Sequence, residues 1–246
     1  MKKSFYLYSL CFISILALLG CSIHSTNTTN NLTQNIQNSL YAIYPTDMTE
    51  TNPSETNEYI SYNKEISLHF PQIYYSDSSD TIKAKQAQIN THLFELATGY
   101  NTQLITSRET YDLKSYTSQY EISFTDEDLL SIKFENQLLS ISHANQYCYG
   151  ITLNTTTGEY LAISDYIAIT SNLIEQIKSH DITYSSQPDY DEDFVISATD
   201  SFIENYNNGF VDKTDCFYLD SDALHIIVPV LQGNGNYIIL NYPLST

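Results

Sequence analysis

The stretch YEISFTDEDLLSIKF, residues 120–134, sets the fold class of this chain. Apolar and polar residues alternate from Tyr120 to Phe124 and again from Leu130 to Phe134, as strands with one buried face require. The acidic segment Thr125–Asp128 lies between the two runs, where a turn is needed. The sequence therefore predicts an antiparallel β-hairpin here.

Helices and further strands flank this hairpin. Before it, residues 59–70 alternate as a strand, and Ser79 or Asp80 can cap a helix that ends at Gly99. After it, the apolar pattern predicts strands near residues 138–141, 147–153 and 160–163, a helical region from Asp165, a helix over 191–207, and strands over 216–219, 224–230 and 237–242. Strands followed by helices and then strands predict an α+β fold, an antiparallel sheet with helices mainly on one face.

The charge balance limits the partners. The 246 residues include 29 acidic and 10 basic side chains, for a formal charge of −19. Nucleic-acid affinity depends on Lys and Arg that neutralise phosphates, so the composition argues against a nucleic-acid partner. With 42% hydrophobic and only 16% charged residues, the chain can build a core.

The N-terminus predicts export. Lys2 and Lys3 precede an apolar run, residues 5–19, that ends Leu-Leu-Gly before Cys21. This is the pattern of a secretory signal, too short for a comfortable membrane span, and it matches a bacterial lipobox in which Cys21 receives lipid. Cleavage would remove two lysines and no acids, leaving a net −21 on the outer face of a membrane. An uncleaved anchor or an ordinary signal with a chance cysteine are the alternatives.

A polar segment follows the signal. Ser, Thr, Asn and Gln occupy 21 of the 36 positions from Ser22 to Asn57, a composition typical of a flexible tether. The apolar residues Leu40, Tyr41, Ile43 and Tyr44 could dock back on the domain and shorten it. We therefore expect a signal peptide at 1–20, a tether at 21–57 and an α+β ectodomain at 58–246.

Short motifs of the ectodomain resemble a known family. They are Gln88-Ile89-Asn90, Leu130-Ser131-Ile132, Thr157-Gly158-Glu159-Tyr160-Leu161 with Ser164-Asp165, and Phe217-Tyr218-Leu219-Asp220 before the aliphatic run 224–228. In this order they resemble the ectodomain family of the bacterial anti-sigma-V factor, also found beside peptidoglycan deacetylase domains. The resemblance covers about residues 58–244. It implies a lysozyme-sensing module, here as a lipoprotein, although Pro229–Asn236 is shorter than the matching family segment.

Catalytic motifs are absent from the sequence. There is no HExxH, GxSxG, P-loop or GxGxxG, and the six histidines show no metal-ligand spacing. The acids at 189, 191, 192 and 193 lack the spaced ligands of a calcium loop and fit the start of a helix. We expect no catalytic residue, no metal and no cofactor.

Two cysteines remain in the mature domain, Cys148 and Cys216. In an exported chain they could form a disulfide whose loop of about 68 residues would contribute on the order of 4 kcal/mol. In a reducing habitat they would be two buried thiols, and the sequence leaves both alternatives open.

These features predict a non-catalytic, surface-anchored binding module whose acidity favours a basic partner such as lysozyme. A cell-wall enzyme or enzyme accessory is the alternative function, and a structural envelope protein is a third. Acidity that serves only solubility is the competing explanation of the charge.

Overall fold

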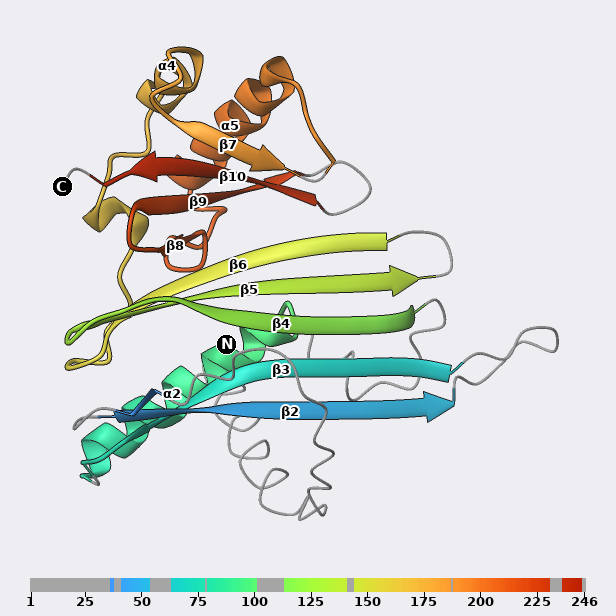
Figure 1. The fold of residues 1–246 in the computed structure, drawn as a ribbon, viewed down its shortest axis with the longest axis vertical. Helices are drawn as coiled ribbons and strands as arrows, with labels where there is room; N and C mark the ends of the chain where they lie inside the picture. Colours follow the sequence, from blue (N-terminus) through green and yellow to red (C-terminus); the bar gives the residue numbers. More distant parts are fainter. Residues whose placement is uncertain are drawn as a thin grey trace. The chain divides into compact units, whose positions relative to one another are not determined.

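The hairpin over residues 120–134 lies inside a six-stranded sheet of the computed structural model (Figure 1). Tyr120 pairs with Phe134 and Ile122 with Ile132, so the predicted antiparallel hairpin is confirmed. The structure describes residues 36–37, 41–53, 63–77, 79–100, 113–140, 144–186, 188–230 and 236–244. All of these belong to one compact unit, residues 34–246.

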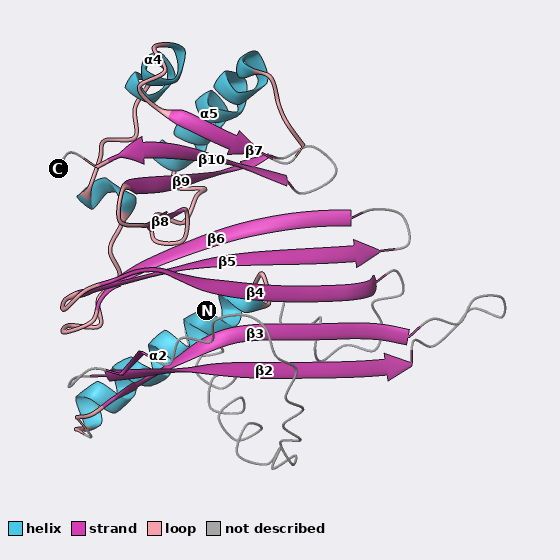
Figure 2. Cartoon of the chain, viewed as in Figure 1, coloured by secondary structure: helices cyan, strands magenta, loops and turns pink. Residues whose placement is uncertain are grey.

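The elements appear in the following order. The strands are β1 (Ile36–Gln37), β2 (Tyr41–Pro53), β3 (Asn63–Tyr75), β4 (Leu113–Thr125), β5 (Leu129–Ser140), β6 (Ala144–Asn154), β7 (Thr183–Ser186), β8 (Phe217–Leu219), β9 (Ala223–Val230) and β10 (Asn236–Pro243). The helices are α2 (Asp80–Ala97), the short 3-10 helix η1 (Ile163–Asp165), α4 (Asn172–Lys178) and α5 (Glu192–Asn207). Figure 2 shows the strands as two groups, each with its own helices.

The first sheet has the order β1-β2-β3-β4-β5-β6, and its pairs are antiparallel except β3 with β4. That parallel pairing spans only Glu65–Leu68 and Ser115–Ser118. Helix α2 packs beside β3, where the Asn90 side chain bonds both backbone groups of Ile73. Ile89, Leu93 and Leu96 of α2 are buried in the core of this sheet.

The second sheet has the order β7-β10-β9-β8, all antiparallel. Its core includes Leu173 and Ile177 from α4 and Val195 and Phe202 from α5. The Asp191 side chain accepts a hydrogen bond from the backbone N–H of Phe194 and so caps α5, at the residue where the sequence begins this helix.

The two sheets meet at Gly150 of β6. Its N–H donates to the Asp215 carbonyl over 3.0 Å, and Gly150 forms a parallel bridge with Cys216, just before β8. A Cβ at this position would lie 2.1 Å from the carbonyl oxygen of Phe217. A glycine here is required because the backbones approach this closely.

The α+β class is confirmed, and several elements differ from the sequence expectation. Residues 138–140, expected to begin a separate strand, are the end of β5. Strand β2 lies within the range expected to form the tether, and Tyr41 and Ile43 are buried, so the ordered domain begins before residue 58. The short strand β7 has no counterpart among the expected elements. Tyr160 forms only an isolated bridge with Leu153 and η1 follows, in place of the expected strand over 160–163. Within the described residues, every helix is too short or too polar to span a bilayer.

Candidate functional site

One face of the first sheet carries polar side chains that are partly or fully exposed over most of its described width. On β3, Ile66, Leu68 and Phe70 are buried in the core, so the residues between them lie on the opposite face. The same alternation and the strand registers extend this face across five strands. We call it the open face; it comprises Asp47, Thr49, Glu65, Ser67, His69, Ser115, Thr117, Gln119, Glu121, Lys133, Glu135, Gln137 and Gln146, all partly or fully exposed.

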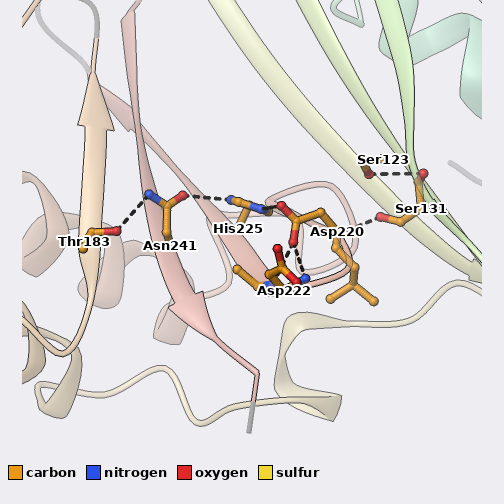
Figure 3. A network of polar contacts seen from close by, with 9 residues as sticks. Ser123, Ser131, Thr183, Asp220, Asp222, His225 and Asn241 are labelled. Carbon is orange, nitrogen blue, oxygen red and sulfur yellow. Dashed lines mark hydrogen bonds and ion pairs between the residues drawn. The ribbon is translucent and has the colours of Figure 1, made fainter. Parts of the chain in front are cut away.

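The second sheet covers the rest of this side. Cys148 of β6 is buried in a small cluster with Tyr218, Ile227 and Ile239. The Ser131 hydroxyl, also buried, accepts a hydrogen bond of 2.8 Å from the N–H of Leu219 (Figure 3). The open face therefore ends where β8, β9 and β10 begin.

The open face is acidic. It holds the carboxylates of Asp47, Glu65, Glu121 and Glu135, and Lys133 is its one lysine or arginine among the described residues. The Lys133 ammonium lies 2.6 Å from Glu135 and 5.6 Å from the centre of the Tyr218 ring, and its side chain is only 17% exposed. Because this cation is already paired, the face presents mainly negative charge to a partner.

A cleft lies at the boundary between the open face and the second sheet. Its volume is about 230 Å³, and it is lined by Thr117, Gln119, Glu135, Asn136, Gln137, Gln146, Tyr147 and Tyr237. Tyr237 comes from β10, and its hydroxyl donates to Glu135 over 3.2 Å. Burial raises the pKa of Tyr237 well above its ordinary value, so the group is a neutral phenol in the physiological range.

Three side chains of the open face are linked in the order of a serine-hydrolase triad. The Ser67 hydroxyl lies 3.3 Å from His69 Nε2, and His69 Nδ1 lies 2.6 Å from Asp47. In such enzymes the aspartate is buried and orients the histidine, but the Asp47 side chain is 72% exposed. The sequence does not predict this surface relay, because Asp47 and His69 come from different strands.

A second histidine anchors the turn between β8 and β9 (Figure 3). His225 Nε2 lies 2.6 Å from Asp220, and His225 Nδ1 lies 2.8 Å from Asn241, which donates to Thr183. Burial tends to raise the pKa of Asp220, but the N–H groups of Asp222 and Ala223 and the His225 imidazole outweigh it and lower that pKa. Because the chain of bonds connects three strands of the second sheet, we assign it to holding that sheet together.

A third histidine connects α2 to the segment just before β8. His92 Nε2 lies 3.1 Å from the buried carboxylate of Asp215 and 3.2 Å from the Tyr100 hydroxyl. The Tyr160 ring packs edge-on against the imidazole. Burial tends to lower the pKa of His92, but the hydrogen bond and charge of Asp215 outweigh it and raise that pKa.

The structure describes two of the three cysteines named as site residues from the sequence. Cys21 lies outside the described residues. Cys148 and Cys216 are both buried and carry free thiols, and burial raises the pKa of each to about 12. The Cys216 segment meets β6 at Gly150, two residues from Cys148, and whether the two cysteines pair stays a prediction.

Metal ligands do not gather in the described part of the chain, where no three His, Cys, Asp or Glu side chains are placed to hold an ion. The expected absence of a metal and of a cofactor stays a prediction.

Comparison with solved structures finds distant likenesses to DUF3298 family proteins. A DUF3298 family protein from Bacteroides fragilis NCTC 9343 has a TM-score of 0.42 and 11% identity, over 84% of this chain and 92% of its own. A DUF3298 family protein from Pseudomonas aeruginosa PAO1 has a TM-score of 0.37 and 12% identity, over 75% of this chain and 82% of its own. No family model matches the chain, and no curated protein does.

Proposed function

We propose that this chain is a non-catalytic binding protein, held at the extracytoplasmic side of a membrane by lipid on Cys21. Its open face binds a basic protein, and lysozyme is the candidate that the anti-sigma-V resemblance names. The observation that carries the proposal is the acidic open face, on which Lys133 is paired with Glu135. The exposed hydroxyl and amide side chains around the carboxylates can supply hydrogen bonds to a partner.

The charge of the whole chain supports the same partner. At a formal −19, the protein attracts cations over long range, and such steering accelerates association by about one to three powers of ten at low salt. Steering is lost once ionic strength brings the screening length to about 8 Å. Binding through the open face is therefore expected to be strongly dependent on salt.

The test uses the immobilised chain and a basic lysozyme as the soluble probe. The double variant Glu65→Gln, Glu121→Gln removes two charges from the open face, and Asp200→Asn, Glu204→Gln removes two from α5. At about 7 Å in water one charge pair contributes about 0.6 kcal/mol, roughly a threefold change. We expect the first variant to slow association by about tenfold and the second to change it by less than about twofold.

Two results would argue against the proposal. If lysozyme is not retained at low ionic strength, the chain does not bind it. If both double variants slow association equally, net charge matters and the open face does not.

The alternative function is a weak cell-wall-modifying enzyme, favoured only by the Ser67–His69–Asp47 relay. A fluorophosphonate probe reacts with an activated serine hydroxyl. Covalent labelling of Ser67, abolished by His69→Ala, would support this alternative. We expect no labelling, because the exposed Asp47 carboxylate is solvated and holds the imidazole weakly.

A further inference from the structure

The cleft beside Tyr237 has a regular floor. In the strand registers, Thr117, Gln137 and Gln146 face one another across β4, β5 and β6, and Gln119 and Glu135 form the adjacent row, beside the buried Cys148. Neighbouring strands lie about 4.8 Å apart, and rows two residues apart lie about 6.7 Å apart. The floor is therefore a small grid of polar side chains.

The polar groups of this floor are available to a ligand. In the described part of the chain, the side chains of Thr117, Gln119, Gln137 and Gln146 make no hydrogen bond. Each glutamine amide offers donors and an acceptor, and the threonine hydroxyl offers both. The backbone groups beneath are already used in the β4–β5–β6 ladder, so only the side chains can bind a ligand.

The cleft itself has little net charge. Lys133 and Glu135 form an ion pair of 2.6 Å, and the Tyr237 hydroxyl donates to the same Glu135 oxygen. An anionic ligand would meet the acidity of the surrounding face, and a cationic group would find Glu135 already paired. A neutral ligand avoids both costs.

The walls add aromatic surface to these hydrogen-bonding groups. The side chain of Tyr237 lines the cleft and offers an apolar body with a polar tip. At about 230 Å³ the cleft is smaller than the roughly 300–1,000 Å³ that holds a drug-sized ligand. It has room for one ring-sized group, with the rest of a longer ligand lying over the open face.

We propose that this cleft binds a neutral saccharide, with ring hydroxyls on Gln119, Gln137 and Gln146 and one sugar face against Tyr237. A polyhydroxylated ring presents donors and acceptors in several directions, which a grid of unpaired amides satisfies. A peptide would rely on backbone pairing at a strand edge, which the floor of the cleft does not offer. This site goes beyond the proposed protein-binding function and does not depend on it.

The experiment is calorimetric and NMR titration of the full chain with three neutral tetrasaccharides: cellotetraose, maltotetraose and chitotetraose. We expect at least one to bind saturably with a dissociation constant at or below about 1 mM. Some glutamine side-chain amide signals should shift on titration. They should include the signals of Gln137 and Gln146, which are identified by their loss in Gln137→Ala and Gln146→Ala. Because the ligand is neutral, affinity should change by less than about twofold between about 20 and about 300 mM salt.

Variants separate saccharide binding from lysozyme binding, although several cleft residues belong to the open face. Gln137→Ala and Gln146→Ala should each weaken saccharide binding by about three- to tenfold, the effect of one hydrogen bond. Glu65→Gln, which lies outside the cleft, should leave saccharide affinity unchanged and weaken lysozyme association. Lysozyme binding can fail without affecting the saccharide result, and the reverse also holds.

Three outcomes would overturn the proposal. The first is the absence of saturable binding of all three tetrasaccharides. The second is binding that the two glutamine variants leave unaffected. The third is that an end-capped alanine peptide, included as a probe, shifts the same amides while no saccharide does, which would assign the cleft to a peptide.

Discussion

The contact between the two sheets at Gly150 makes a sharp prediction for Gly150→Ala. The added Cβ would lie 2.1 Å from the Phe217 oxygen, 2.4 Å from its carbonyl carbon and 2.9 Å from the Tyr218 nitrogen. These are backbone atoms and cannot rotate away. An ordinary contact of about 3.4 Å would require β8 to move about 1.3 Å from β6.

That movement stretches two hydrogen bonds between the sheets, Gly150 to Asp215 at 3.0 Å and Leu219 to Ser131 at 2.8 Å. Overpacking costs about 1 to 3 kcal/mol, and leaving one buried bond unmade costs about 1 to 3 kcal/mol more. We therefore expect Gly150→Ala to lower the free energy of unfolding by about 2 to 6 kcal/mol. The typical total is only about 5 to 15 kcal/mol.

Urea denaturation followed by circular dichroism measures this loss, with the slope compared between variants. Gly209→Ala is the control, because Gly209 has φ +76° but a Cβ added there would meet no atom within 4 Å. It should cost only the backbone strain, about 1 to 2 kcal/mol. If Gly150→Ala costs no more than Gly209→Ala, the sheets do not meet as described.

Buried or paired groups give three further predictions. The folded-state pKa of His92 is raised, so the bond between His92 and Asp215 stabilises the fold fully below the unfolded pKa of His92, about 6.5, and this stabilisation is lost as pH rises through the folded pKa. His92→Gln should therefore cost more stability near pH 6 than near pH 8.5 in urea titrations. Equal costs at the two pH values would contradict this. The Cys148 and Cys216 thiols, with a pKa of about 12, should resist iodoacetamide in the native state and should both react in denaturant. Peptide mass spectrometry measures the labelling. Labelling that occurs only after reduction would instead reveal a disulfide. The folded-state pKa of Asp220 is lowered, so its contribution to stability is present above its unfolded pKa of about 3.9 and is lost as pH falls through the folded-state pKa. Asp220→Asn should therefore shift the midpoint of acid unfolding to higher pH. An unchanged midpoint would refute this.

The sequence predicts the elements whose signals are local. The hairpin over 120–134 has its alternation and turn within 15 residues, and α5 has its cap at Asp191. Strand β2 resembles a tether in sequence because its polar residues, among them the exposed Asp47 and Thr49, obscure the pattern of the buried Tyr41 and Ile43. A strand of four residues such as β7 is too short to show a period.

The candidate site is less accessible from sequence than the fold. Alternation of Glu121 and Ser123 with apolar residues indicates a polar face, but not whether a second sheet covers it. Ser123 bonds to Ser131 near the covered end, whereas Glu121 is exposed. His92 and Asp215 are 123 positions apart, so only the folded chain reveals the pair. His225 and Asp220, five positions apart, are the one pair that spacing could suggest.

The short parallel ladder between β3 and β4 divides the first sheet into two parts that are expected to fold and open at different stages. Strands β4, β5 and β6 follow one another through hairpins, so their contacts are local and can form early. The β2–β3 ribbon is joined to them in the sheet by four residue pairs, Glu65–Leu68 with Ser115–Ser118, and these partners are 50 positions apart. The ribbon is expected to dock last and open first, as a separate cooperative unit in native-state hydrogen exchange. That unit contains four residues of the open face: Asp47, Glu65, Ser67 and His69. A partner that binds across both parts of the sheet would therefore hold the two parts together and slow hydrogen exchange of the whole sheet.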